Sequence, residues 1–272
     1  MKKVILGISP CPNDTFMFAN LLKNPVADFD VRFEDIETLN KMALREETDI
    51  TKLSYHTWLK LHNKYKLLNS GGALGENCGP VLISRYKAYP DEVPGMHIAI
   101  PGKLTTAALL LDIFFPDVKS KTSYVFSEIE DIVMDGECDA GLIIHESRFT
   151  YERKGLKKIV DLGSLWEDTY HLPTPLGGIA IHRRVPENIA KKIDKSLQDS
   201  IKMANDDPAS VMSFVRKYAQ SMDDDVIKQH INLYVNRFSP GDEPAVEKSI
   251  RKLAELALYR KIITQMPGRI FV

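Results

Sequence analysis

The chain has few cysteines, almost no net charge and no long apolar run. Its three cysteines, Cys11, Cys78 and Cys138, are odd in number and show no CxxC spacing. This pattern indicates neither a disulfide framework nor a zinc site, and it predicts reduced thiols. The net charge of -1 leaves no basic excess for binding phosphates, so nucleic acid and anionic membranes are not expected partners. No stretch reaches the roughly 18 apolar residues of a membrane span. A small solute is the expected partner.

Signals for secretion and for cofactors are also missing. Met1-Lys2-Lys3 is followed by a short apolar run, Val4 to Ile8, without a small-residue cleavage site, which predicts a cytoplasmic protein. The glycine-richest stretch, residues 67–80, matches neither a P-loop nor a dinucleotide fingerprint, although its glycines allow backbone to approach a ligand closely. No nucleophile elbow or metal-ligand pair is present. We therefore expect no metal and no cofactor.

What is present begins with a strand, a polar loop and a helix. Residues 4–8 predict a buried strand, and the apolar spacing of residues 15–22 predicts a helix. The octet Ser-Pro-Cys-Pro-Asn-Asp-Thr-Phe, residues 9–16, joins them. In an open α/β sheet, ligands bind at the carboxyl ends of strands beside helix N-termini, so Ser9 and Asn13 are candidate ligand contacts. The alternative is a rigid turn in which Asn13 or Asp14 caps the helix.

The rest of the chain alternates strands and helices and then becomes helical. Strands are predicted at 30–36, 49–54, 81–84, 97–100, 122–126, 140–144 and 179–182, and helices at 39–46, 55–65, 107–115, 128–135, 188–204, 208–219, 225–238 and 244–263. The order strand-helix-strand-helix-strand at the start implies parallel pairing.

Two proline-bearing linkers, 89–95 and 171–178, divide this pattern. We predict an α/β protein whose first domain is discontinuous, residues 1–93 and 179–272, and whose second is residues 96–174. Such a layout places a ligand cleft between domains that can close on a solute. A single doubly wound sheet is the alternative.

Polar groups gather at the expected cleft. Thr105 and Thr106 precede the helix that starts near residue 107, where free N–H groups suit a carboxylate or phosphate, although a helix cap explains the same residues. Lys52 and Ser54 end the third strand and are candidate anion contacts, although Lys52 taken alone is more typical of a solvated lysine at a strand edge. A solute with a carboxylate or several hydroxyls is therefore expected to bridge the two domains.

One histidine stands out among seven. His145 is the first polar residue after the buried strand at 140–144, which is a crevice position. Imidazole titrates near neutrality, so His145 is a candidate general base, with a ligand-binding or structural role as the alternative. The contexts of His62, His182 and His230 predict surface positions.

The octet at residues 9–16, directly after an N-terminal strand, closely resembles the opening of the 1,4-dihydroxy-6-naphthoate synthase family of menaquinone biosynthesis. The resemblance extends along the chain. It implies a class II periplasmic-binding-protein fold and a cofactor-free carbon-carbon lyase acting on cyclic dehypoxanthinyl futalosine. It also implies that the segment Lys52-Leu53-Ser54 and the pair Thr105-Thr106 bind substrate, and that His145 is the general base.

Two other functions fit the same pattern. A solute-binding or sensory protein without catalysis would share the fold. The related chorismate dehydratase is the second alternative, although its family does not carry the octet. The sequence does not fix the oligomeric state, and a homodimer is compatible with it.

Overall fold

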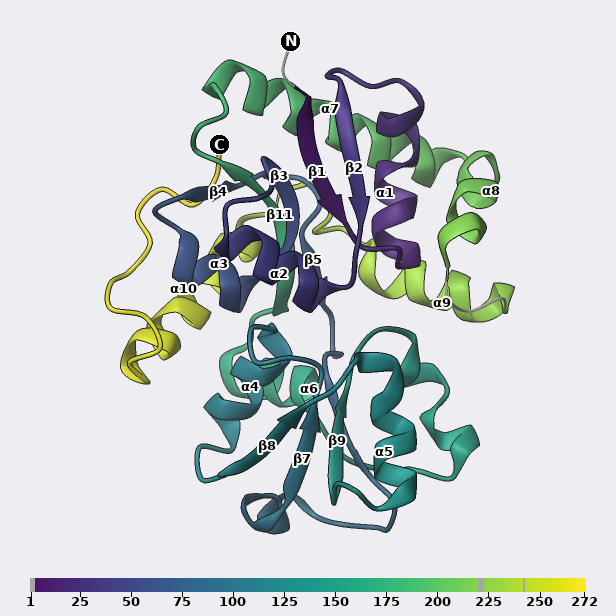
Figure 1. The fold of residues 1–272 in the computed structure, drawn as a ribbon, viewed down its shortest axis with the longest axis vertical. Helices are drawn as coiled ribbons and strands as arrows, with labels where there is room; N and C mark the ends of the chain where they lie inside the picture. Colours follow the sequence, from purple (N-terminus) through teal and green to yellow (C-terminus); the bar gives the residue numbers. More distant parts are fainter. Residues whose placement is uncertain (1–2, 220–222, 242) are drawn as a thin grey trace.

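The computed structural model describes residues 3–219, 223–241 and 243–272, with the side chain of Glu146 left out. Two lobes lie one above the other, each built around its own sheet (Figure 1). The first and the last described residues, 3 and 272, lie in the upper lobe, here called the first lobe (Figure 1). Among the described residues, no helix has the length and the apolar run that crossing a bilayer requires.

The first lobe contains a six-stranded sheet in the order β2-β1-β3-β11-β4, with β5 also paired to β11. Its strands are β1 (Val4–Ile8), β2 (Phe29–Phe33), β3 (Ile50–Ser54), β4 (Tyr65–Leu67), β5 (Ala73–Gly75) and β11 (Thr174–His182). β1 pairs in parallel with β2 and β3, as the sequence predicted. β11 runs antiparallel to β3, β4 and β5. The third strand therefore ends at Ser54 with its carboxyl end toward the second lobe (Figure 1).

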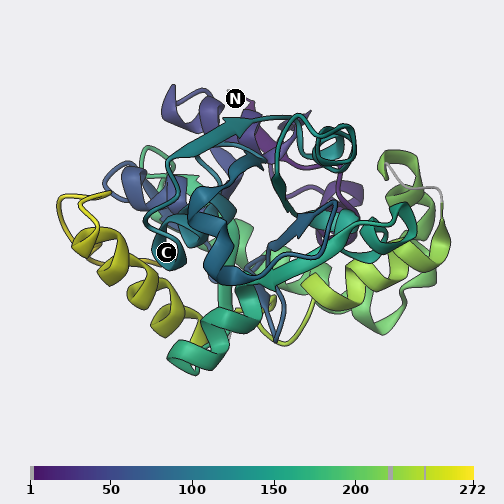
Figure 2. The same cartoon turned by 90° about the horizontal axis from the view of Figure 1, so that it is seen from below.

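Two groups of helices cover this sheet. They are α1 (Pro12–Lys23), α7 (Glu187–Asp206), α8 (Ala209–Tyr218) and α9 (Asp224–Tyr234) in one group, and α2 (Ile36–Leu44), α3 (Tyr55–Leu61) and α10 (Pro244–Tyr259) in the other. The first group packs around α1 in one apolar core. Seen from below, α10 and the α8–α9 pair lie on opposite sides of the molecule (Figure 2). The four C-terminal helices predicted from their apolar faces are all confirmed.

The second lobe contains a five-stranded sheet in the order β10-β6-β9-β7-β8. Its elements are β6 (Val81–Ser84), β7 (His97–Ile100), β8 (Ser120–Ser123), β9 (Ala140–Ile143), β10 (Lys157–Asp161), α4 (Thr106–Phe114), α5 (Ile129–Asp135) and α6 (Leu162–Tyr170), with short 3-10 helices η1 (Pro90–Gly95), η2 (Phe126–Glu128), η3 (His145–Phe149) and η4 (Tyr151–Lys154). An apolar cluster continues between the lobes, from Leu53 and Trp58 to Leu110 and Trp166.

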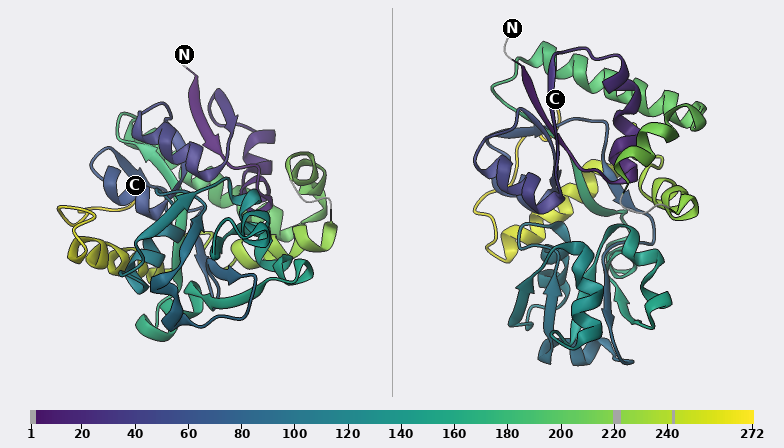
Figure 3. Two further views of the ribbon diagram at one scale, coloured as in Figure 1. Left: turned by 60° about the horizontal axis from the view of Figure 1, so that its bottom comes forward. Right: turned by 45° about the vertical axis from the view of Figure 1, so that its right-hand side comes forward.

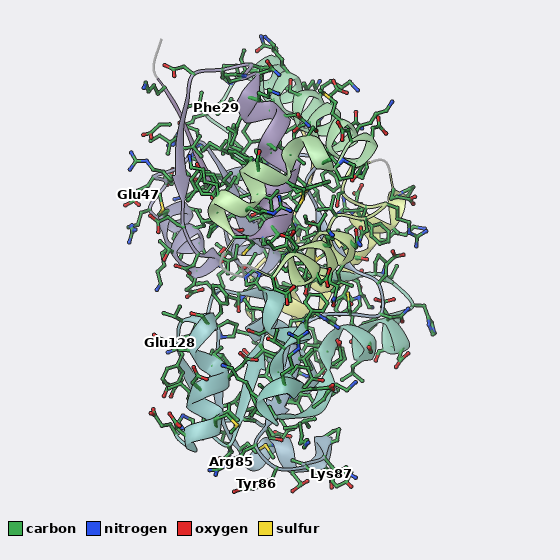
Figure 4. All side chains as sticks on the ribbon, turned by 90° about the vertical axis from the view of Figure 1, so that its right-hand side faces the viewer. Phe29, Glu47, Arg85, Tyr86, Lys87 and Glu128 are labelled. Carbon is green, nitrogen blue, oxygen red and sulfur yellow. The ribbon has the colours of Figure 1, made fainter. Side chains whose placement is uncertain are left out.

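The chain enters the second lobe earlier than the sequence analysis predicted. β6 pairs with β9 and β10 in the second sheet, so the assignment of residues 81–84 to the first domain is wrong. The proline-bearing linker at 89–95 is instead η1, beyond β6 and within the second lobe, and the segment Arg85-Tyr86-Lys87 before it lies at the far end of this lobe (Figure 4). The crossing follows β5, where residues 76–80 connect the two sheets (Figure 3). β6 is fully buried, as are β3 in the first sheet and β9 in the second, so its apolar composition does not show to which sheet it belongs.

The crossing segment depends on a close contact between two glycines. A Cβ on Gly79 would lie 2.7 Å from Gly163 Cα at the start of α6, and a Cβ on Gly163 would overlap the carbonyl of Cys78. We expect Gly163→Ala to lower the free energy of unfolding by about 1–3 kcal/mol, because backbone cannot yield as a side chain can. Urea unfolding would measure this change. Gly268→Ala, whose Cβ meets nothing within 4 Å, is the control and should change it by less than about 0.5 kcal/mol. Equal stabilities of the two variants would contradict this account.

Candidate functional site

A cavity of about 680 Å³ lies between the lobes. It is lined by Ser9, Asn13, Ile36, Lys52, Ser54, Ala73, Gly177 and Tyr234 from the first lobe, by Thr105, Thr106, Ala107, Ile144 and His145 from the second, and by Gly79, Pro80 and Leu176 where the chain crosses. Seven of the eight predicted site residues therefore line one cavity. The exception is Leu53, whose side chain is fully buried in the core.

The loop before α1 differs in detail from its prediction. α1 begins at Pro12, one turn earlier than expected, and Cys11 is its N-cap without a side-chain hydrogen bond. Neither Asn13 nor Asp14 caps the helix, so that interpretation is wrong. Asn13 lines the cavity, whereas Asp14 is fully buried behind it and accepts a hydrogen bond of 2.7 Å from Lys52 Nζ.

The N-terminus of α4 opens into the cavity. Thr105 is the N-cap: its hydroxyl accepts the N–H of Ala108 and donates to Gly102 O. The hydroxyl of Thr106 donates to Leu176 O. Because the first N–H groups of a helix have no intrahelical partner, those of Thr106 and Ala107 remain for a ligand. Both residues line the cavity, and the helix dipole favours an anion at this position.

Ser54 faces the same cavity from the first lobe. It is the N-cap of α3, and its side chain caps nothing. Asn40 on α2 holds it from both sides, accepting the N–H of Ser54 at 3.1 Å and donating to Ser54 Oγ at 3.0 Å. An accepted hydrogen bond leaves the hydroxyl proton of Ser54 available for a ligand oxygen.

The two helix N-termini are tied together by His56. Its backbone N–H donates to Thr106 Oγ1, and its ring Nδ1 lies 3.2 Å from Thr105 O. A carbonyl only accepts, so Nδ1 carries the proton. Burial, with a smaller effect of the charge of Lys60, lowers the pKa of His56 to about 4. His56 is therefore neutral at physiological pH and joins the lobes as a hydrogen-bond donor.

His145 is held in an unusual backbone conformation. It follows β9 at the start of η3 with φ of 59°, in the left-handed region that non-glycine residues rarely adopt. Its ring meets Phe126 edge-on, with centroids 4.8 Å apart, and Cys11 Sγ lies 3.6 Å from its Nδ1. Strained backbone of this kind is concentrated at functional sites.

His230 is the residue that the sequence analysis placed wrongly. It was expected at the surface, but its side chain is fully buried on α9 and its ring stacks on that of His145, with centroids 6.1 Å apart. Burial first, and then the nearby His145 and Lys52, hold the pKa of His230 well below its ordinary value. The signal was available in the sequence, because His230 shares one face of the helix with Ile227 and Tyr234. His62 and His182 are half-buried rather than exposed.

No three histidine, cysteine, aspartate or glutamate side chains in residues 3–219, 223–241 and 243–272 are grouped to hold an ion. The polar groups at the cavity are instead an ammonium, hydroxyls, helix N–H groups and an imidazole. Such a set can bind an anionic solute and move a proton.

The chain matches a family model described as menaquinone biosynthesis over residues 4–259. It is 38% identical over 278 residues to the 1,4-dihydroxy-6-naphthoate synthase of Thermus thermophilus, which covers all of both chains. It is 40% identical over 242 residues to the protein of the same name from Streptomyces coelicolor, which covers 86% of this chain and 85% of that one.

Solved structures agree with the expected fold. Protein AF1704 from Archaeoglobus fulgidus superposes with a TM-score of 0.90 at 32% identity, covering 96% of this chain and 98% of the other. The alkanesulfonate-binding protein SsuA from Xanthomonas axonopodis, bound to MOPS, gives 0.71 at 12% identity, covering 99% and 96%. At that identity the likeness concerns the fold alone. The predicted two-domain periplasmic-binding-protein-like fold is confirmed.

The neutral buried histidines predict how stability depends on pH. His56 has a pKa near 4 in the folded chain and about 6.5 in the unfolded chain. Between about pH 4 and pH 6.5 the unfolded state therefore binds more protons than the folded state. The stabilisation is complete above about pH 6.5 and falls by about 1.4 kcal/mol per pH unit as the pH drops toward 4. Urea unfolding from pH 7 to 4 would measure this loss.

The matched variant is His56→Asn, because an asparagine side-chain amide can also donate to Thr105 O but does not titrate. We expect a shallower loss of stability on acidification in this variant. His171→Asn, at an exposed position, should keep the steep dependence of the wild type. An unchanged slope in His56→Asn would show that His56 titrates alike in both states.

Proposed function

The chain belongs to the menaquinone-biosynthesis family, and we propose that it is a lyase that converts cyclic dehypoxanthinyl futalosine to 1,4-dihydroxy-6-naphthoate, with His145 as the general base. The names of its full-length relatives support an enzyme of this kind. The observation that carries the assignment to residues is the position of His145. Its imidazole lines the same cavity as the open N-terminus of α4, so that a bound carboxylate and a base face one solute.

The substrate carboxylate binds, in this proposal, where the two helices begin. The N–H groups of Thr106 and Ala107 point along the dipole of α4, and the Ser54 hydroxyl has a proton to give. Lys52 adds an ammonium at the cavity wall. Charge-assisted hydrogen bonds of this kind are among the strongest that a protein makes to an anion.

The proposed reaction requires the protein to orient the substrate and to supply one base. His145 removes a proton from the bound substrate, and collapse of the resulting anion breaks a carbon-carbon bond and expels the sugar-derived fragment. The bicyclic ring system becomes aromatic in this step, which supplies the driving force. The cavity between the lobes holds the substrate close to the imidazole.

A solute-binding protein without catalysis is the second candidate, because the same fold occurs in the sulfonate-binding protein named above. The strained backbone at His145 favours the enzyme, since a binding site needs no base held in this way. The chorismate dehydratase alternative is disfavoured by the full-length relatives, which carry the name of the naphthoate synthase.

Replacing His145 tests the base directly. We expect wild-type protein to form 1,4-dihydroxy-6-naphthoate from cyclic dehypoxanthinyl futalosine, and His145→Ala to bind substrate but react about 100-fold or more slowly. Chromatography with mass detection measures turnover, and calorimetry measures binding. His171→Ala is the matched control, because His171 is also a histidine at positive φ, 54°, but lies outside the cavity. Binding without turnover in the wild type would leave only a solute-binding protein.

Replacing Ser54 tests the carboxylate site. The carboxylate does not react, so its contacts contribute equally to the ground state and the transition state. We therefore expect Ser54→Ala to raise KM by about tenfold and to change kcat by less than about twofold. Steady-state kinetics measure both constants, with Ser120→Ala on the exposed edge of β8 as control. A fall in kcat at unchanged KM would instead place Ser54 near the reacting atoms.

A further inference from the structure

Asp14 is a fully buried carboxylate in the first turn of α1 and does not line the cavity. Its Oδ2 accepts two hydrogen bonds from Ser9, at 3.2 Å from the backbone N–H and at 2.7 Å from the hydroxyl. Its Oδ1 accepts from Asn13 Nδ2 at 3.0 Å and from Lys52 Nζ at 2.7 Å. One carboxylate thus holds three side chains, and each of the three lines the cavity.

These hydrogen bonds also fix what each side chain can offer to a ligand. Ser9 gives its hydroxyl proton to Asp14, so it faces the cavity as an acceptor. Lys52 uses one of its three N–H groups on Asp14 and keeps two donors. The wall between β1 and β3 therefore presents an acceptor beside a cation. That pair fits a substrate hydroxyl next to an oxygen that carries or develops negative charge.

Lys52 depends on Asp14 more than the other two residues do. Its side chain is 8% exposed, and its ion-pair partner is Asp14 at 2.7 Å. The nearby imidazole of His230 supplies no negative charge. A buried ammonium is stable only beside an opposite charge and with its hydrogen bonds satisfied. Asp14 supplies both.

We propose that Asp14 is a positioning residue for the reaction, which acts chiefly through Lys52 by holding its ammonium at the cavity wall, and which sets Ser9 as an acceptor beside it. This inference rests on the proposed function for the identity of the substrate. It adds a residue that itself contacts no substrate atom. This residue determines the polarity of the cavity wall, which does contact the substrate.

A double-mutant cycle on kcat/KM with cyclic dehypoxanthinyl futalosine tests the inference. We expect Asp14→Asn and Lys52→Met each to lower kcat/KM by about 100-fold, because the asparagine amide turns a donor toward donors and the methionine has no charge. In the Lys52→Met background, Asp14→Asn should cost less than about threefold. A further loss of tenfold or more in that background would overturn the inference. This arm decides the matter even where Asp14→Asn alone fails to fold.

Asp194 on α7 provides a matched control. It accepts the same kinds of donor as Asp14, namely the N–H and hydroxyl of Ser70 and the side-chain amide of Asn69, but lies outside the cavity. Asp194→Asn should lower the thermal midpoint and leave kcat/KM of the folded protein within twofold. An equal loss of kcat/KM in Asp194→Asn and Asp14→Asn would show a general structural effect and overturn the inference.

A crystal structure of Asp14→Asn separates this inference from the proposed function. Should the wild type show no turnover, the proposed function fails, and the position of Lys52 still decides the role of Asp14. We expect Lys52 Nζ to leave its position and the Ser9 hydroxyl to rotate in this variant. Unchanged positions of both side chains would overturn the inference.

Discussion

The cavity depends on the hydrogen bonds that join the first turn of α3 to the loop before α4. The N-termini of α3 and α4 are joined here by hydrogen bonds. Neutral His56 donates from Nδ1 to Thr105 O, while Thr57 donates to Leu104 O at 2.8 Å. The carbonyl groups that precede α4 are thereby satisfied from the other lobe. The N–H groups of Thr106 and Ala107 remain for a ligand, so the contact that holds the lobes together also leaves an anion site open.

Local patterns in the sequence predicted most helices and strands. The sheet to which a strand belongs depends instead on long-range packing. Strands such as β6 and β7 and the helices after Pro186 follow from apolar spacing, because burial of one face is a local requirement. The sheet to which β6 belongs is not a local property: it pairs with β9 and β10, which lie more than 50 residues further along the chain. Seven of the eight predicted site residues line one cavity, because the polar residues at strand ends of both sheets converge between the lobes, and their roles stay a prediction. The surface position predicted for His230 was wrong because helical spacing places it with Ile227 and Tyr234 on the buried face of α9.

Charge at the cavity is arranged so that its groups do not oppose one another. The ammonium of Lys52 has its counter-ion in Asp14, and burial keeps His230 and His56 neutral. A second full positive charge beside His145 would disfavour the protonated form of its imidazole. The proposed base must reach that form when it takes up a proton. The neutral state of His230 is thus compatible with proton transfer to His145. The cavity walls are mainly apolar, and their low polarity strengthens each remaining interaction.

The contacts of His145, the proposed base, connect its ring to the arrangement of the lobes. The backbone of His145 belongs to the second lobe, but two of its ring contacts, Cys11 and His230, belong to the first. The α4 N-terminus comes from the same lobe as His145, whereas Lys52 and Ser54 come from the other. A solute held by both lobes would therefore meet the His145 imidazole, the proposed base, whose ring contacts come from both lobes. A protein that only binds its solute needs no particular direction of this ring. The proposed proton transfer does need one, and the contacts of His145 with both lobes supply it.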